Sequence, residues 1–221
     1  MIMYTIIFDM DGVLFDSENL DKKVWYDLAE QYRIKNIKQA FEECIGTPDT
    51  NIISVLDRYL KESGVEMSGE EFRRRTLVMF DEYVDKFGMP LKFYAGECLK
   101  ALKNKGYKVG LASSTPIERV RKQLSDTGLI GYFDDIVGGG MFTHGKPDPE
   151  IFLMSCERLK GIPDESVVIE DSYNGIRAAY AAGMKPIMVP DVLGPDKEME
   201  EKTWKILKDL KEVAELLTGD N

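Results

Sequence analysis

Five short apolar runs along the chain are typical of strands that are buried on both faces of a sheet. They cover Tyr4–Phe8, Lys108–Ala112, Asp135–Val137, Val167–Ile169 and Pro186–Val189. Helical patterns alternate with these runs, and a glycine follows each of them, over Glu97–Lys105, Pro116–Thr127, Glu150–Lys160 and Tyr173–Ala182. Because strands that alternate with helices form βα units, we predict an α/β protein with a doubly wound parallel sheet.

One long segment interrupts this alternation. From about Asp16 to Met89 the apolar positions have helical spacing, and no convincing strand is present. The positions that carry this spacing are Leu20, Val24, Leu28, Phe72, Leu77 and Phe80. We therefore expect a helical domain at residues 16–89, inserted after the first strand, and an α/β core made of residues 1–15 and 90–221.

The net charge of −10 narrows the range of partners. Such a surface repels nucleic acids and anionic membranes, and no apolar run reaches the roughly 20 residues of a membrane helix. The cysteines, Cys44, Cys98 and Cys156, are widely spaced, and the N-terminal run lacks the basic start of a signal peptide. We expect a cytoplasmic protein with reduced thiols. The apolar positions of the last helix are more typical of a core than of a dimer face, which favours a monomer.

Two carboxylates follow directly on the first strand, in the stretch DMDG. Asp9 and Asp11 are two positions apart, so in an extended segment their side chains lie on the same side, and Gly12 permits a tight turn. The pair suits a carboxylate nucleophile beside an acid/base with a bound cation. A solvated turn after a strand is the alternative.

Hydroxyl groups follow a later strand, in the stretch SSTP. A helix that begins at Pro116 would present free N–H groups beside Ser113 and Ser114, which is a favourable place for an anion. The alternative is that the hydroxyls only cap the helix, with Thr115 and Glu118 forming a capping box.

A lysine and a second pair of acids complete the polar clusters. Lys146, in the stretch GKPDPE, suits a phosphate group or is an ordinary surface lysine. His144 is the only histidine, which excludes a multi-histidine metal site. Glu170 and Asp171 either cap a helix or join the other acids at one sheet edge, where they would repel one another without a cation. All-oxygen ligands with few carboxylates favour Mg²⁺.

Taken in order, DMDGV, SST, GKPDPE and EDSYNGI resemble the motifs of the haloacid dehalogenase-like hydrolases. The closer resemblance is to the β-phosphoglucomutase-like and phosphoglycolate-phosphatase-like branch, and it covers essentially the whole chain. It implies a Rossmann-like core with a small α-helical cap domain inserted after the first strand. It also implies a Mg²⁺-dependent phosphohydrolase that acts on a small phosphate monoester, such as a sugar phosphate, through an aspartyl-phosphate. The alternatives are a phosphomutase and, from another class, a non-catalytic binding module on the same fold.

The resemblance also assigns roles to residues. Asp9 is similar to the nucleophile and Asp11 to the acid/base of the family. The phosphate-binding groups would be Ser113, with Ser114 beside it, and Lys146, which would also offset the charge of Asp9 or bridge the acids. The Mg²⁺ ligands would be Asp9, Asp11 through its backbone carbonyl, and Asp171, with Glu170 as an outer or alternative ligand.

The inserted segment favours a phosphatase over a mutase. Caps of the β-phosphoglucomutase type carry a histidine shortly after the first motif and an arginine after a glycine. Here Asp21 lies near the first place, and Thr47–Thr50 contain no arginine. Other basic residues that could hold a distal group are Lys22, Lys23, Arg73, Arg74 and Arg75. Asp16 and Glu18 suit a hinge, a substrate entrance or a solvated helix start equally well.

Overall fold

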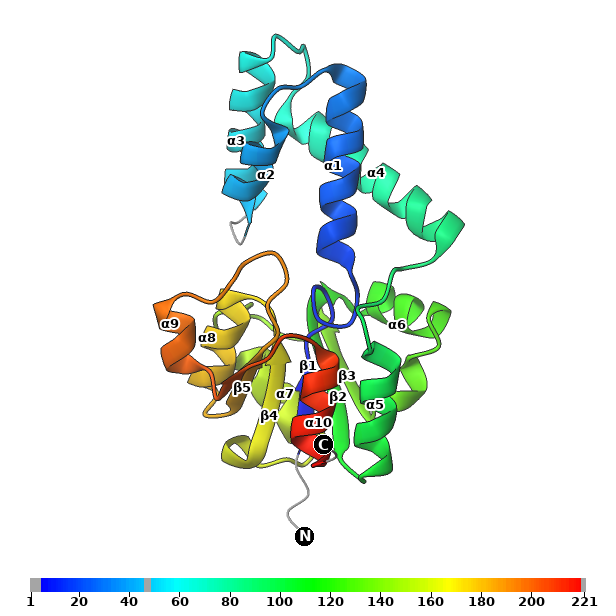
Figure 1. Ribbon diagram of the computed structural model, residues 1–221, viewed down its shortest axis with the longest axis vertical. Helices are drawn as coiled ribbons and strands as arrows, with labels where there is room; N and C mark the ends of the chain where they lie inside the picture. Colours follow the sequence, from blue (N-terminus) through cyan, green and yellow to red (C-terminus); the bar gives the residue numbers. More distant parts are fainter. Residues whose placement is uncertain (1–4, 46–48, 220–221) are drawn as a thin grey trace. The chain divides into compact units, whose positions relative to one another are not determined.

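The apolar runs form the strands of one parallel sheet. The computed structural model describes residues 5–45 and 49–219. Within these residues the sheet has six strands in the order β3-β2-β1-β4-β5-β6, and all neighbours are parallel (Figure 1). The strands are β1 (Thr5–Phe8), β2 (Lys108–Pro116), β3 (Asp135–Gly139), β4 (Ser166–Glu170), β5 (Lys185–Met188) and β6 (Lys205–Ile206). The predicted α/β fold with a parallel sheet is confirmed.

The register between β1 and β4 brings the segments that follow these two strands together at the carboxyl edge of the sheet. Every residue of β1 is buried, and Phe8 pairs with Leu111 of β2 and with Ile169 of β4. The Asp9 N–H then donates a hydrogen bond to the Ile169 carbonyl at 2.9 Å. The strand order reverses between β1 and β4, and open parallel sheets bind their ligands outside the carboxyl ends of the strands at such a point.

Helices cover both faces of the sheet. They are α5 (Ala95–Asn104), α6 (Ile117–Asp126), α7 (Glu150–Arg158), α8 (Tyr173–Ala181), α9 (Lys197–Lys202) and α10 (Leu210–Thr218), with single 3₁₀ turns at Ile130–Tyr132 and Pro163–Glu165. Figure 1 shows α5 and α10 side by side in front of the sheet, with α7 behind it. On the α7 side, Ile7 and Val168 of the sheet pack with Phe152 of α7 and Ala178 of α8.

In the described part of the segment between β1 and α5, four helices form a separate compact unit. They are α1 (Ser17–Tyr32), α2 (Ile37–Cys44), α3 (Asp49–Glu62) and α4 (Gly69–Phe87). This unit spans Ser17–Pro90, and the rest of the chain forms the other unit. The predicted helical insertion after the first strand is confirmed.

The helical unit has a small aromatic core. The Trp25 ring contacts Phe41 and Phe72 edge to face, with ring centroids 5.3 and 5.2 Å apart. Leu20, Val24 and Leu28 are buried, as their spacing predicts. The prediction for Leu77 is wrong, because its exposed fraction is 42% and Thr76 is buried instead. Residues spaced by four share a helix face, so Thr76 continues the stripe of Phe72 and Phe80.

The chain leaves and re-enters the α/β unit at one place. The Lys92 N–H donates to the Leu14 carbonyl at 2.9 Å, and Phe15 and Leu91 form an antiparallel bridge. The Lys92 ammonium lies 3.2 Å from the Asp16 carboxylate and 2.7 Å from that of Asp191. The two ends of the insertion are therefore tied together by backbone bonds and by this ion-pair group.

All three cysteines are free and buried. Among the helices that the structure describes, none combines the length and apolar character needed to cross a bilayer.

Candidate active site

The loop after β1 is fixed by buried apolar side chains. Its residues Met10, Val13, Leu14 and Phe15 are completely buried. The Phe15 N–H donates to the Met10 carbonyl at 3.1 Å, and the Gly12 N–H donates to the Phe15 carbonyl at 3.0 Å. Gly12 has φ +77°, a conformation that glycine adopts without strain. This packing holds Asp9 and Asp11 at the strand end.

Lys146 joins the first and last acidic motifs. Its ammonium donates to Asp9 Oδ1 at 2.5 Å and to Glu170 Oε1 at 2.7 Å, and it lies 5.0 Å from the centre of the Phe152 ring. The Asp9 and Lys146 side chains are about one tenth exposed, and that of Glu170 is 1% exposed. A lysine from the loop before α7 therefore bridges carboxylates at the ends of β1 and β4.

Burial and charge act against each other in this group. Burial raises the pKa of Asp9 to about 8; Lys146 opposes the shift, while Glu170 and Asp11 add to it. Burial lowers the pKa of Lys146, but Asp9 and Glu170 outweigh it and raise that pKa above its usual range. The lysine therefore stays charged, and Asp9 needs further positive charge nearby to be fully ionised.

The N-terminal end of α8 holds Glu170 in place. The N–H and the hydroxyl of Ser172 donate to Glu170 Oε2 at 2.7 and 2.9 Å. The Ser172 hydroxyl also caps α8 by accepting from the Gly175 N–H at 3.1 Å. One serine thus connects the carboxylate of β4 to the helix that follows.

Two glycines make room for the acids. A Cβ at Gly175 would lie 1.7 Å from Glu170 Oε1, and a Cβ at Gly12 would lie 2.2 Å from Asp171 Oδ2. Real Cβ atoms do not approach so closely. Both carboxylates therefore pack directly against glycine backbone.

The acids at this edge fit a hard divalent cation. Asp9, Glu170 and Asp171 each offer a carboxylate oxygen, and these oxygens lie within 4.8 Å of one another. An all-oxygen set with one lysine nearby keeps an excess of negative charge, which is what Mg²⁺ requires of a site with few protein ligands. The Asp11 carboxylate is outside this set and accepts a hydrogen bond from Thr115.

The hydroxyl motif differs from its predicted structure. Ser113, Ser114 and Thr115 belong to β2, and α6 starts at Ile117 without a side-chain cap. The expected capping box is wrong because Thr115 Oγ1 donates to Asp11 Oδ2 at 2.9 Å instead. Ser113 is buried and accepts from the Thr115 N–H at 3.0 Å, whereas Ser114 is exposed.

The contact of Thr115 was missed, although the sequence held a signal for it. In a strand, residues two apart point to the same face, so Ser113 and Thr115 form a pair like Asp9 and Asp11. The roles of Ser172 and Gly175 had no such signal, since they depend on where a distant carboxylate lies.

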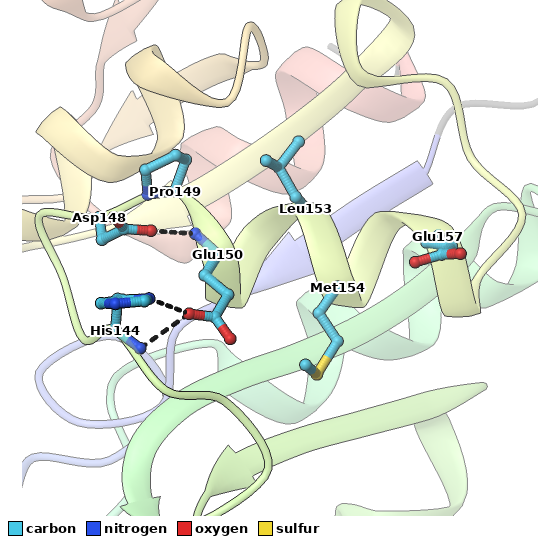
Figure 2. A pocket seen from close by; sticks show the side chains of 7 residues that line it. All are labelled: His144, Asp148, Pro149, Glu150, Leu153, Met154 and Glu157. Carbon is cyan, nitrogen blue, oxygen red and sulfur yellow. Dashed lines mark hydrogen bonds and ion pairs between the residues drawn. The ribbon is translucent and has the colours of Figure 1, made fainter.

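The single histidine lies in a shallow depression. Figure 2 shows this shallow pocket of about 420 Å³ beside α7, where His144, Asp148 and Glu150 come together. Glu150 accepts hydrogen bonds from the Thr143 and His144 N–H groups at 2.9 and 2.7 Å, and its Oε2 lies 2.8 Å from His144 Nδ1. Asp148 accepts from the Glu150 N–H at 2.9 Å. We interpret this group as the closure of the loop that carries Lys146.

The arginines of the helical unit have acidic partners of their own. Arg73 donates to Asp21 at 2.9 Å, and Arg74 and Arg75 form ion pairs with Glu71 at 2.6 Å. Asp21, at the place where a mutase cap carries histidine, therefore belongs to an ion pair within this unit. Positions 46–48, which include part of the stretch without arginine, lie outside the described residues.

Comparison with known proteins decides the family. Residues 6–189 match the family described as haloacid dehalogenase-like hydrolase. The chain belongs to this family. It is 36% identical over 221 residues to the phosphorylated carbohydrates phosphatase of Thermotoga maritima, covering 96% of this chain and all of that protein. It is 32% identical to the phosphoglycolate phosphatase of Aquifex aeolicus, covering 83% of each.

A solved structure resembles the chain over its whole length. It is that of a candidate β-phosphoglucomutase from Thermotoga maritima, with a TM-score of 0.82, 30% identity and coverage of 99% of this chain and 100% of that one. The predictions of the haloacid dehalogenase-like family, of its branch with a helical cap and of a phosphatase are confirmed. A non-catalytic module is therefore no longer a competing interpretation.

Proposed function

We propose that this phosphatase hydrolyses a small phosphorylated carbohydrate through an aspartyl-phosphate on Asp9. The observation that carries the proposal is the bridge of Lys146 between Asp9 and Glu170 at the point where the strand order reverses. A carbohydrate phosphate is favoured because the relative with 36% identity over its whole length is named for such substrates.

In the first step, a carboxylate oxygen of Asp9 attacks phosphorus. The bond from phosphorus to the sugar oxygen breaks, and Asp11 gives its proton to that oxygen, so that a neutral alcohol leaves. Lys146 and the hydroxyl of Ser113, with Ser114 beside it, hold the phosphoryl oxygens. Lys146 also favours the ionised form of Asp9, which is the form that can attack.

In the second step, water attacks the phosphorus of the aspartyl-phosphate. Asp11, now ionised, takes a proton from this water, and the bond from phosphorus to Asp9 breaks. Inorganic phosphate leaves, and both aspartates return to their starting forms. Using one group as acid and then as base lets the same side chain serve both half-reactions.

The residues that would hold Mg²⁺ are Asp9 and Asp171, with Glu170 as an outer or alternative ligand and Asp11 through its backbone carbonyl. When bound, the ion supplies positive charge that offsets the phosphoryl oxygens and the surrounding carboxylates. Lys146 alone balances only one of these acids, so the proposal includes a requirement for the metal.

We propose that residues 16–89 act as a cap domain that selects the substrate. Closing such a domain excludes bulk water from phosphoryl transfer. The Arg73–Asp21 pair would then set the internal structure of the cap.

A panel assay tests the proposal. Phosphate release would be followed for sugar phosphates, sugar-alcohol phosphates and phosphoglycolate, with Mg²⁺ and with EDTA. We expect metal-dependent release, with a carbohydrate phosphate well ahead of the others, and no turnover in a folded Asp9→Asn variant. Clear activity of Asp9→Asn, or full activity of the stripped enzyme in EDTA, would contradict the mechanism.

A mutase remains the second candidate because the similar solved structure is that of a candidate β-phosphoglucomutase. A mutase returns the phosphoryl group to the sugar instead of passing it to water. Incubation with β-glucose 1-phosphate separates the two, since glucose 6-phosphate without free phosphate would identify the mutase. We expect free phosphate.

A further inference from the structure

Thr115 connects the end of β2 to the loop that carries the aspartates. Its Oγ1 donates a hydrogen bond to Asp11 Oδ2 at 2.9 Å, in a partly buried setting. We propose that Thr115 is a positioning residue that orients the carboxyl group of Asp11 for proton transfer. This inference rests on the function proposed above, in which Asp11 is the acid/base.

Thr115 is itself held firmly. It lies within β2, and its N–H donates to the hydroxyl of Ser113, which is 1% exposed. The next residue, Pro116, pairs with Gly139 of β3, after a register shift that follows Ala112. A β-branched side chain also has few χ1 states. The hydroxyl is therefore a donor at a fixed place, and it restrains a carboxyl group that would otherwise rotate.

The contact has a direct chemical consequence. Because the hydroxyl of Thr115 engages Oδ2, the other oxygen of Asp11 is left to exchange the proton with the leaving oxygen and with water. General acid–base catalysis contributes about 10²–10⁴-fold to rates, and it depends on correct orientation of the group. Thr115 would act through Asp11 without touching the substrate.

This role has a signature that binding or stability alone would not give. A poor leaving group needs the proton from Asp11, whereas an acidic phenol leaves without it. Loss of the Thr115 hydroxyl should therefore reduce the rate of hydrolysis most for the substrates whose leaving groups are least acidic. A series of aryl phosphates shows this without involving sugar hydroxyls.

The experiment measures kcat/KM for aryl phosphates of graded leaving-group acidity, with Mg²⁺, in the wild type and in Thr115→Val. For the variant we expect a steeper dependence on leaving-group acidity, with a loss of roughly tenfold for phenyl phosphate. We expect p-nitrophenyl phosphate to change by less than about threefold, and Thr115→Ser to restore the wild-type slope. Thr115→Ala serves if the valine variant does not fold. A control is Thr127→Val, because the Thr127 hydroxyl donates to the backbone carbonyls of Gln123 and Leu124 in α6.

Asp11→Asn separates this inference from the proposed function. One outcome is that Asp11→Asn steepens the dependence of kcat/KM on leaving-group acidity while Thr115→Val lowers kcat/KM equally for all substrates. In that case the positioning role is wrong and the acid role of Asp11 stands. If Asp11→Asn itself leaves the slope unchanged, the acid role fails and the inference fails with it. In support, Thr115→Val should add no further steepening in the Asp11→Asn background.

Discussion

Lys146 is the residue on which the charge balance of the site depends. Removing it by Lys146→Ala leaves Asp9 and Glu170 buried without a cation, which should lower the free energy of unfolding of the metal-free protein by about 3–5 kcal/mol. Lys103, which forms a more exposed pair with Asp134, provides the matched control, and Lys103→Ala should cost at most about 1 kcal/mol. Urea denaturation compares the two, and equal losses would contradict the assigned charge balance.

The raised pKa of Asp9 predicts a pH dependence of stability. In the metal-free folded protein, burial raises the pKa of Asp9 from its ordinary 3.8 to about 8, although Lys146 opposes the shift. The contribution of the protonated Asp9 to the free energy of unfolding is therefore fully present below pH 3.8, and it declines as the pH rises toward 8. Without metal, the stability of Asp9→Asn relative to wild type should increase from pH 5 to pH 8. Thermal melts check this, and a constant difference would mean that Asp9 is ionised throughout.

Single residues also show where sequence reasoning stops. Asp9, Asp11, Lys146 and Glu170 follow apolar runs or rigid turns, so a parallel sheet places them at one edge. A helix cap is the alternative that the sequence offers for Thr115, because local capping rules and long-range contacts predict different partners for the same hydroxyl. Only the register of β1 against β2 decides between them.

At the scale of elements, the start of α8 is the part of the site most sensitive to packing. Gly175→Ala should displace the Glu170 carboxylate, since the added Cβ has no room. Changes around metal ligands typically cost 10–100-fold in activity or metal affinity, and we expect a loss of this size. Gly96→Ala, in the helix α5, meets only Leu129 at 3.8 Å and should keep full activity. Titrating the activity of both variants with Mg²⁺ measures these effects. Wild-type activity and Mg²⁺ affinity of Gly175→Ala would contradict the predicted clash between the added Cβ and Glu170.

Elements with regular periodicity were predicted well. The strands were legible as apolar runs because both faces of the sheet are covered, and most helices ended at the expected glycines. The sequence did not predict that β2 extends through Pro116, because the polar stretch SSTP has the composition of a loop. Within this stretch only Pro116 pairs with β3, at Gly139 and after a register shift, which no local pattern encodes.

For the molecule as a whole, metal binding and folding should be coupled. A ligand that binds only the native state adds about 2.7 kcal/mol at 100 times its Kd, which raises Tm by roughly 5–10 °C for a chain of this size. Mg²⁺ should therefore raise Tm, and Asp171→Asn should reduce the shift. Asp148→Asn, in the group around His144, should retain it. Loss of the shift in Asp148→Asn alone would place the metal beside His144 instead.

The chain leaves the α/β unit at Leu14–Phe15 and re-enters it at Leu91–Lys92, and these two segments are hydrogen-bonded neighbours. This arrangement affects how such proteins can diversify. Because the insertion starts and ends at neighbouring backbone positions, its length and content place no demand on the spacing of the strands. A different domain can therefore replace the insertion at this site, in evolution or by engineering, while the α/β unit and its acidic residues stay unchanged. A new specificity can then be acquired by exchanging one continuous piece of the gene.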